Sequence, residues 1–337
     1  MRSYQLVATE KIALLDVPAP EPGPHDVLVR VKACGICSRT DLVYYRYLGI
    51  KSRIGKGHFG HEPSGVIEKV GEAVQGWAAG DRVFLRTASA PGGFSDYTLA
   101  RPVHIGRLPD HMSFVEGAPA QQVPIAINAT RNVRAGDYVV IFGQGSAGLQ
   151  LTQMCRLRGA AKIVTADLYE SRCQLSLRLG ADVAVKVPDQ DIERAVRDAF
   201  AGRQPDVVID AVGIPSVARK CVDLVRSEGT VVIFGTHHVE EEVTFSLVQW
   251  ESKALTIHMA NEGSDETYAR AMRLAERLLA ERRIETAPYI THVFPPERLP
   301  EAIALLEKSP LLYTEAEAAR ITFPPKQAIK IVIDMEK

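Results

Sequence analysis

Two cysteines and a Gly-His-Glu triplet are the first residues whose types and spacing could do chemistry. Cys34 and Cys37 form a Cys-x-x-Cys pair at the end of a predicted strand, and His61-Glu62 follows on a separate loop. A thiolate and an imidazole with an adjacent carboxylate suit zinc, and a catalytic zinc needs three protein ligands and one open position. The spacing alone leaves a metal site and an ordinary histidine–glutamate pair equally open.

A glycine-rich loop in the stretch Val139–Gly148 (VVIFGQGSAG) is the second such group. Four apolar residues of strand character run into Gly-x-Gly-x-x-Gly, which opens a predicted helix. Gly143 permits a tight turn, Gly145 leaves room for a pyrophosphate, and Gly148 lets the helix pack close to the strand. The helix N-terminus presents free N–H groups to phosphates. We expect the cofactor to contact Gly143, Gly145, Ser146, Ala147 and Gly148.

An acidic residue, Asp167, ends the next apolar run, 19 residues after Gly148. Its carboxylate is placed to accept a hydrogen bond from a ribose 2′-hydroxyl. A 2′-phosphate would meet the same negative charge, so the sequence favours NAD over NADP. Strand, glycines, helix and acid together predict a dinucleotide-binding unit.

The elements that must position these groups are of two kinds. Up to about residue 105, apolar and polar residues alternate, which predicts strands over 26–31, 65–70, 81–85 and 97–100. From about residue 137, strands alternate with helices, which predicts a doubly wound parallel sheet, an α/β fold. Residues 285–337 return to short β runs. We therefore expect a nucleotide domain (124–284) inserted between two pieces of a β-rich domain (1–123 and 285–337).

The totals exclude several classes of protein. A formal net charge of −1 over 337 residues gives no strong attraction to nucleic acid or to an anionic membrane. No apolar run approaches the ~20 residues of a membrane helix, and the N-terminus lacks the uninterrupted apolar stretch of a signal peptide. Five unevenly placed cysteines argue against a disulfide framework. We expect a soluble, cytoplasmic protein.

Short motifs follow one another along nearly the whole chain, in the order A-C-G-I-C, G-H-E, V-G, G-D-R-V, G-G-F, G-x-G-x-x-G and D. In this order they resemble the zinc-dependent medium-chain dehydrogenase/reductase family. The resemblance implies a GroES-like catalytic domain beside a Rossmann domain. It makes Cys37 the thiolate ligand and His61 the imidazole ligand of a catalytic zinc, with Cys34 a neighbour. The family's lobe of four cysteines for a structural zinc is missing, since residues 84–100 contain none. At most one zinc per chain is therefore expected.

The third zinc ligand has two candidates under this resemblance. Gln121 falls where the family often has a glutamate, and a neutral amide is a weak zinc ligand. The family's polyol dehydrogenases instead use the carboxylate of Gly-His-Glu, with water as the fourth ligand. We therefore expect Glu62 as the ligand, and Gln121 as a weak ligand or a hydrogen-bond partner of the bound water. Alternatively, Glu62 reaches the metal only during turnover.

The segment after Cys37, Ser38-Arg39-Thr40-Asp41, is one residue longer than the family's usual wording. If the extra residue is absorbed locally, Thr40 relays the substrate proton and Asp41 supports His61 through its second nitrogen. Otherwise Arg39 occupies the relay position. Tyr44 matches a position near substrate in polyol dehydrogenases, or is a wall residue without a catalytic part.

Further cofactor contacts follow from the resemblance and from the ends of two strands. Arg172 resembles the family's basic contact to the adenosine ribose, although it could be a solvated helix residue. Lys330 resembles a late basic contact to the pyrophosphate. The strand ends Val212-Gly213 and Phe234-Gly235 should flank the nicotinamide.

The activity implied is oxidation of a secondary alcohol (a polyol, sugar or cyclitol) to a ketone, with hydride transfer to NAD and one catalytic zinc. Two alternatives are a zinc-free reductase of the quinone or enoyl type and a nucleotide-binding protein without turnover. The family habit implies a homodimer or homotetramer acting on a small molecule. The stretch 308–327 is longer than expected and could shape the cleft or a subunit contact.

Overall fold

The computed structural model describes residues 1–47, 59–87, 90–235, 244–260, 263–307, 314–318, 320 and 328–337. The chain divides into two compact units, which we describe separately. Unit 1 comprises Met1–Pro124, Gly263–Lys308 and Lys330–Lys337, and unit 2 comprises Ile125–Glu262 and Ser309–Ile329. Most of the long stretch 308–327 lies outside the described residues.

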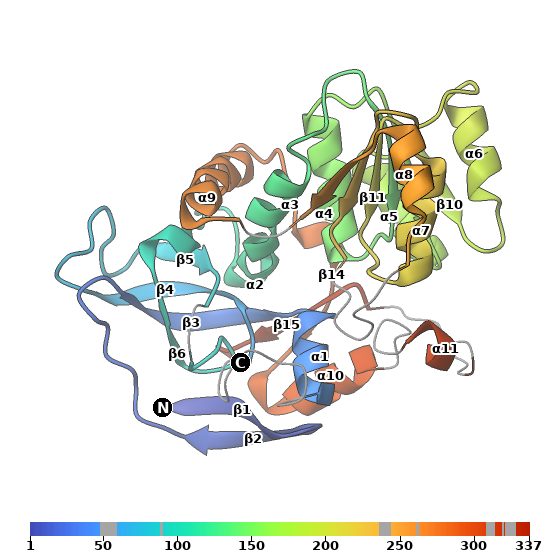
Figure 1. The fold of residues 1–337 in the computed structure, drawn as a ribbon. Coiled ribbons are helices and arrows are strands. Elements are labelled where there is room, and N and C mark those ends of the chain that lie inside the picture. The colour runs from blue at the N-terminus through green and yellow to red at the C-terminus, as the bar shows by residue number, and fades with distance from the viewer. Residues whose placement is uncertain are drawn as a thin grey trace. The chain divides into compact units, whose positions relative to one another are not determined.

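Unit 1 is built on a seven-stranded sheet, in the order β14-β15-β3-β4-β5-β7 with β6 paired to β3. Alternating apolar residues of its central strands, such as Val27, Val29 and Ile67, form a fully buried core. A separate hairpin, β1–β2, lies at the N-terminus (Figure 1). The strands of this unit are β1 (Arg2–Ala8), β2 (Lys11–Asp16), β3 (Val27–Ile36), β4 (Glu62–Val70), β5 (Arg82–Leu85), β6 (Tyr97–Ala100), β7 (Ile105–Arg107), β14 (Ile290–Phe294) and β15 (Lys330–Asp334).

Short helices surround this sheet, and one of them differs from the expected domain boundary. Helix α9 belongs to unit 1, whereas the sequence placed residues 263–284 with the nucleotide domain. The ring of Tyr268 in α9 packs edge-on against His104, and Glu276 accepts a hydrogen bond from the backbone N–H of Arg107 at 2.7 Å. These contacts fix α9 on β7. The helices are α1 (Thr40–Tyr47), η1 (Pro102–His104), α2 (Phe114–Gly117), η2 (Ala118–Gln122), α9 (Asp265–Ala280), η3 (Ala287–Tyr289), η4 (Pro296–Arg298) and α10 (Leu299–Glu307), while α3 (Val123–Ala129) spans the border of the units.

Unit 2 is a doubly wound domain, as the sequence predicted. Its six strands are all parallel in the order β10-β9-β8-β11-β12-β13, which is 3-2-1-4-5-6 in chain order. The strands are β8 (Tyr138–Phe142), β9 (Lys162–Asp167), β10 (Val183–Lys186), β11 (Val207–Asp210), β12 (Thr230–Ile233) and β13 (Thr256–Met259), and the helices are α4 (Ser146–Leu157), α5 (Glu170–Arg178), α6 (Ile192–Ala199), α7 (Pro215–Leu224), α8 (Leu247–Lys253) and α11 (Glu315–Ala318).

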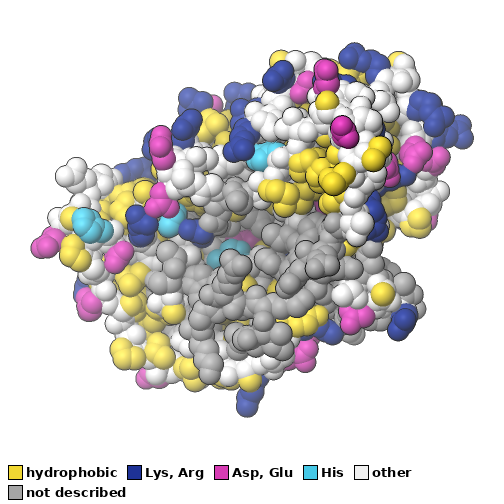
Figure 2. Space-filling model, in the orientation of Figure 1, with side chains coloured by type: hydrophobic (Ala, Val, Ile, Leu, Met, Phe, Trp, Pro, Cys, Tyr) yellow, Lys and Arg dark blue, Asp and Glu magenta, His cyan; other side chains and the backbone are white. Residues whose placement is uncertain are grey.

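The strands of unit 2 read as continuous apolar runs because helices cover the sheet. Val139, Val140 and Ile141 of β8 are fully buried, and side chains of α6 and α7 close the core from outside. This rigid sheet carries the glycine-rich loop at the end of its first strand. No helix among the described residues is long and apolar enough to cross a membrane. Figure 2 shows cationic and anionic side chains interspersed on the face it draws.

A buried ion pair fastens the C-terminal strand to the N-terminal part of unit 1. Strand β3 lies between β15 and β4, and Lys330 of β15 reaches Glu62 of β4 at the end of β3. The Lys330 Nζ–Glu62 Oε2 distance is 2.7 Å, and the two side chains are 1% and 0% exposed. A buried charge without a partner is costly, so each of these groups depends on the other.

We predict that Lys330→Met destabilises the metal-free protein by about 3–5 kcal/mol, because Glu62 is left as an uncompensated buried charge. Urea unfolding of EDTA-treated protein measures this. The matched control is Arg30→Met, which breaks the exposed Arg30–Glu68 pair between β3 and β4 and should cost less than about 1 kcal/mol. Equal losses in the two variants would contradict the prediction.

Candidate functional site

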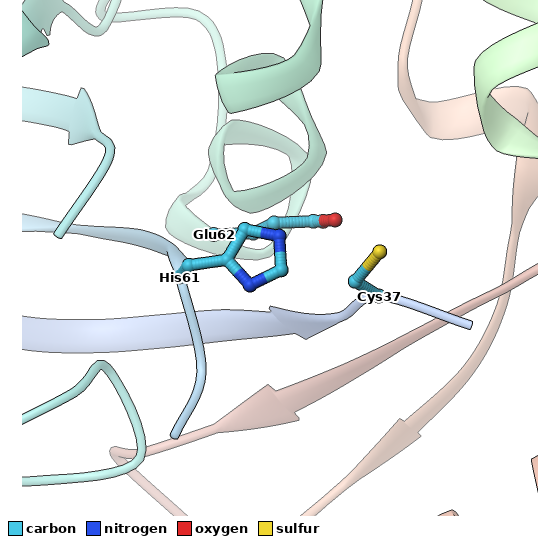
Figure 3. Close-up of side chains that lie close together, drawn as sticks. All are labelled: Cys37, His61 and Glu62. Carbon is cyan, nitrogen blue, oxygen red and sulfur yellow. The ribbon is translucent and has the colours of Figure 1, made fainter. Parts of the chain in front are cut away.

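The antiparallel register of β3 and β4 brings Cys37, His61 and Glu62 together (Figure 3). Gly35 pairs with Glu62, so the end of β3 meets the start of β4, and Cys37 lies two residues beyond that pair. One donor atom from each of the three side chains lies within 4.8 Å of the others. Tetrahedral zinc with bonds of about 2.0–2.3 Å holds its ligand atoms within about 4 Å of one another, so small shifts of these side chains suffice, and the donors are those that zinc prefers. The residues therefore fit a single zinc ion.

Asp41, at the start of α1, orients two of these residues. Its Oδ2 accepts a hydrogen bond from the backbone N–H of Cys37 at 2.8 Å, and its Oδ1 lies 3.0 Å from Nδ1 of His61. Asp41 is fully buried. A carboxylate on one ring nitrogen leaves the other nitrogen of His61 to a metal. The structure thus shows the support of His61 by Asp41 that the sequence left conditional.

Cys37 and His61 shift each other's pKa in opposite directions. Burial alone would raise the pKa of the Cys37 thiol, but the hydrogen bond and charge of His61 outweigh it and lower that pKa. Burial alone would lower the pKa of His61, but Asp41 and Cys37 raise it well above its ordinary value. Metal binding at this pair must therefore displace the proton of His61.

Lys330 is buried against Glu62 instead of facing a pyrophosphate, which corrects the expectation from the family resemblance. Its Nζ donates to Glu62 Oε1 at 3.0 Å, to Glu62 Oε2 at 2.7 Å and to the carbonyl of Ile36 at 3.2 Å. Burial lowers the pKa of Lys330, but Glu62 and Cys37 outweigh it and raise that pKa, so the cation persists. All three ammonium hydrogens have an acceptor inside unit 1. A single lysine in an otherwise apolar strand could have indicated this pair, because a buried lysine nearly always has an acidic partner.

Glu62 has a second donor that sequence reasoning missed. Gln122 in η2 donates from Nε2 to Glu62 Oε1 at 3.0 Å. A Cβ on Gly35 would lie only 2.6 Å from Glu62 Oε2, so a larger residue there would push the carboxylate away from its present position. The carboxylate is therefore held between Lys330, Gln122 and the bare backbone of Gly35. No pattern in the sequence indicated Gln122.

Gln121 and Cys34 are both buried, and each lies next in sequence to a residue that contacts Glu62, namely Gln122 and Gly35. The side chain of Gln121 is 1% exposed, and its Oε1 has no hydrogen-bond partner among the described residues. Cys34 is fully buried, and burial raises the pKa of its thiol well above the ordinary value, so it stays protonated. Cys34 is not part of the metal-binding cluster found in the described chain.

Thr40 and Tyr44 both belong to α1, the helix that begins beside Cys37. The backbone N–H of Thr40 donates to Sγ of Cys37 at 3.3 Å, which places Thr40 next to the centre. Tyr44 follows by one helical turn and projects from the same face of the helix. Arg39 precedes the helix. The catalytic roles of Thr40 and Tyr44 stay predictions.

The three glycines of the loop in unit 2 have the geometry that the sequence required. Gly143 has a φ of 87°, which favours glycine. A Cβ on Gly148 would lie 1.9 Å from the carbonyl oxygen of Gly143, so only glycine allows this close packing. A Cβ on Gly145 would meet no atom within 4 Å, so its surroundings are open. Ser146 and Ala147 begin α4 directly behind it.

Asp167 ends β9 beside this loop and is tied to it. Its Oδ2 accepts a hydrogen bond from the backbone N–H of Gln144 at 2.7 Å, and its Oδ1 accepts one from the backbone N–H of Tyr169 at 3.0 Å. Arg172 lies near, with its NH1 3.8 Å from Asp167 Oδ2, and donates from NH2 to the carbonyl of Ala328 at 2.8 Å. Its side chain is only 12% exposed, so Arg172 is not a solvated helix residue.

The ends of β11 and β12 meet through Asp210, which sequence reasoning missed. Oδ1 of Asp210 accepts hydrogen bonds from the backbone N–H groups of Val212 and Gly213 at 2.8 and 2.9 Å. Its backbone carbonyl accepts from Phe234 and Gly235 at 2.9 and 2.8 Å. The four expected residues are therefore neighbours, and the acid at the end of VVID was the available signal.

Comparison with known proteins agrees with both units. Residues 23–110 match the family model of the alcohol dehydrogenase GroES-like domain, and residues 147–277 match that of the zinc-binding dehydrogenase. Sorbitol dehydrogenase of Gallus gallus is 29% identical over 317 residues, covering 85% of this chain and 87% of that protein. D-xylulose reductase of Saccharomyces cerevisiae is 26% identical over 317 residues, covering 84% and 87%.

A solved structure shows the same fold over the whole chain. The alcohol dehydrogenase TADH from Thermus sp. ATN1 superposes with a TM-score of 0.81 at 24% identity, covering 99% of each chain. The two family models together match more than half of this chain: the GroES-like match lies within unit 1, and the zinc-binding dehydrogenase match covers most of unit 2 and extends into α9 of unit 1. The chain therefore belongs to the zinc-dependent medium-chain dehydrogenase/reductase family and is an oxidoreductase.

Proposed function

We propose that this enzyme oxidises a secondary alcohol of a polyol, sugar or cyclitol to a ketone, with NAD as hydride acceptor and one zinc per chain. The observation that carries the proposal is the cluster of Cys37, His61 and Glu62 at the edge of the unit 1 sheet. The polyol class is supported by relatives named sorbitol dehydrogenase and D-xylulose reductase. The departures at Ser38-Arg39 leave the individual substrate to experiment.

We assign Cys37, His61 and Glu62 as the zinc ligands. Zinc at this position supplies a Lewis acid that lowers the pKa of an alcohol hydroxyl in its open coordination position. Asp41 holds His61 in the ligating tautomer, and Lys330 offsets the charge of Glu62. Gln121 carries an unpartnered buried amide oxygen, which suits a hydrogen-bond partner of water or alcohol better than a ligand.

The other residues orient the cofactor and move the proton. Residues 143–148 bind the pyrophosphate of NAD through backbone N–H groups at the start of α4. Asp167 accepts from the adenosine ribose with Arg172 beside it, and the backbones at Val212-Gly213 and Phe234-Gly235 flank the nicotinamide. Thr40 relays the proton of the alcohol hydroxyl, taking it up as its own hydroxyl proton passes on to water, and Tyr44 lines the substrate side. Hydride then passes from the substrate carbon to the nicotinamide.

We predict that Cys37→Ser and His61→Ala each abolish zinc binding and lower turnover by about 1,000-fold or more. That is the size of the loss when one group that stabilises charge in the transition state is removed. Their affinity for NADH should change less than about threefold, because the dinucleotide residues belong to unit 2. Zinc content by mass spectrometry, NADH fluorescence titration and NADH formation across a panel of polyols and cyclitols measure this. Cys34→Ser is the control and should keep its zinc.

The outcomes separate the competing functions. Either ligand variant with normal turnover would show that the zinc mechanism is wrong. Purified protein with no zinc but with reductase activity on quinones or enoyl compounds would support the zinc-free alternative. Bound zinc without turnover on any alcohol would support a nucleotide-binding protein.

We predict that the enzyme prefers NAD over NADP and that Asp167→Ser reduces the ratio of their kcat/KM values by at least about tenfold, because the repelling carboxylate is gone. Steady-state kinetics with both cofactors measure the ratio. Asp182→Ser is the control, since Asp182 also accepts from a backbone N–H, that of Ile163 at the start of β9. An unchanged ratio in Asp167→Ser would contradict this assignment.

We propose that the enzyme is a homo-oligomer that associates through the edge of the unit 2 sheet. Among the described residues, β13 pairs with β12 alone, so its outer edge is open. Near this edge, Leu247 and Val248 of α8 are each 75% exposed, and Met259 of β13 is 62% exposed. An open strand edge with exposed apolar side chains pairs readily with a second copy.

We predict that light scattering gives the mass of a dimer or tetramer for the unaltered chain and half that mass for the Leu247→Asp/Val248→Asp variant, because two charges replace apolar contacts. The control is Leu14→Asp in the N-terminal hairpin, where Leu14 is 52% exposed. That variant should keep the full mass. A monomeric unaltered chain would contradict the proposal.

A further inference from the structure

Gln144, the residue between the first two glycines of the loop, is fully buried although the glycine pattern places no demand on it. Its Nε2 donates to the carbonyl of Gly143 at 2.9 Å. Its Oε1 accepts a hydrogen bond from Oγ1 of Thr152 at 2.9 Å. Thr152 lies in α4, one helical turn after Gly148, the last glycine of the loop. Oγ1 of Thr152 also lies 3.0 Å from the carbonyl of Gly148. The amide thus connects the start of the loop with the helix at its end.

The backbone of the same residue connects the loop with the ribose end of the site. The N–H of Gln144 donates to Asp167 Oδ2 at 2.7 Å. Gly143 is held in parallel, since its N–H donates to the carbonyl of Ala166 at 2.8 Å. One buried residue therefore joins the glycine loop, helix α4 and the acid that ends β9.

A loop with three glycines has much conformational freedom to lose when a ligand orders it. Contacts that hold it in the bound shape beforehand reduce that cost and increase affinity. The hydrogen bonds of Gln144 do this without exposing the side chain, which is 0% accessible and so does not itself meet a cofactor.

We infer that Gln144 is a positioning residue for the dinucleotide, held by Thr152, that keeps the glycine loop in the shape that receives the pyrophosphate and couples that loop to Asp167. The inference rests on the proposed function, since it presumes a dinucleotide cofactor. The glycine pattern itself specifies only three glycines and makes no demand on positions 144 and 152.

The test measures binding of ADP-ribose and of NADH by isothermal titration calorimetry. Thr152→Val keeps the shape of the side chain and removes the donor to Gln144, and Gln144→Met keeps length and removes both side-chain hydrogen bonds. We expect the Kd of both ligands to rise about tenfold in Thr152→Val, as for one lost hydrogen bond, and at least as much in Gln144→Met, which loses two. ADP-ribose has no nicotinamide, so equal losses locate the effect at the loop.

Two comparisons separate positioning from general destabilisation. Thr165→Val removes an equally buried hydroxyl of the same unit, whose partners are Ser176 at 2.8 Å and the carbonyl of Val183, and neither belongs to the loop. It should lower the melting temperature without changing either Kd by more than about twofold. The double variant Gln144→Met/Thr152→Val should bind no more weakly than Gln144→Met alone, because both changes break the same hydrogen bond.

The inference is overturned if folded Thr152→Val binds ADP-ribose as tightly as the unaltered chain, or if the losses of the two single variants add in the double variant. Loss of affinity in Thr165→Val equal to that in Thr152→Val would also overturn it. An unaltered chain that binds neither ADP-ribose nor NADH would instead overturn the proposed function, and the positioning role with it.

Discussion

A carboxylate placed in a protein interior must have its charge offset, and the cluster of Cys37, His61 and Glu62 is organised around that requirement. Glu62 is fully buried at the end of a sheet, between the ammonium of Lys330 and the amide of Gln122. Lys330 arrives from the last strand of the chain, so the order of the whole unit 1 sheet is needed to complete the centre. Cys37, His61 and Glu62 would hold a zinc that supplies a Lewis acid, and the ammonium of Lys330 would offset the charge of Glu62 beside it.

The cofactor side depends on backbone geometry rather than on charge pairs. Close packing of Gly148 on Gly143 sets the turn, and strand ends on β8, β9, β11 and β12 present backbone groups at the same edge of a parallel sheet. Asp167 and Asp210 each accept two backbone N–H groups, and so each fixes the end of a strand. The two carboxylates make the edge rigid before any ligand is present.

Much of this was predictable because it is local in sequence. The glycine loop, Asp167 and the pair His61-Glu62 can each be recognised from a short stretch of sequence. The alternation of strands and helices likewise predicts the doubly wound sheet. Long-range partners were not predictable in the same way. Lys330 was assigned to the pyrophosphate because nothing near it in sequence shows that β15 pairs with β3. Helix α9 was likewise misplaced, since its contacts to β7 are set by packing and not by its own periodicity.

The most direct test of the central claim is X-ray absorption at the zinc K edge of the purified enzyme, because it reads the donor atoms without reference to turnover. The account predicts one sulfur neighbour at about 2.3 Å and nitrogen or oxygen neighbours at about 2.0–2.2 Å. That result corresponds to Cys37, His61, Glu62 and a water. Two sulfur neighbours would place Cys34 on the metal, and a shell without sulfur would remove Cys37; either result would contradict the account.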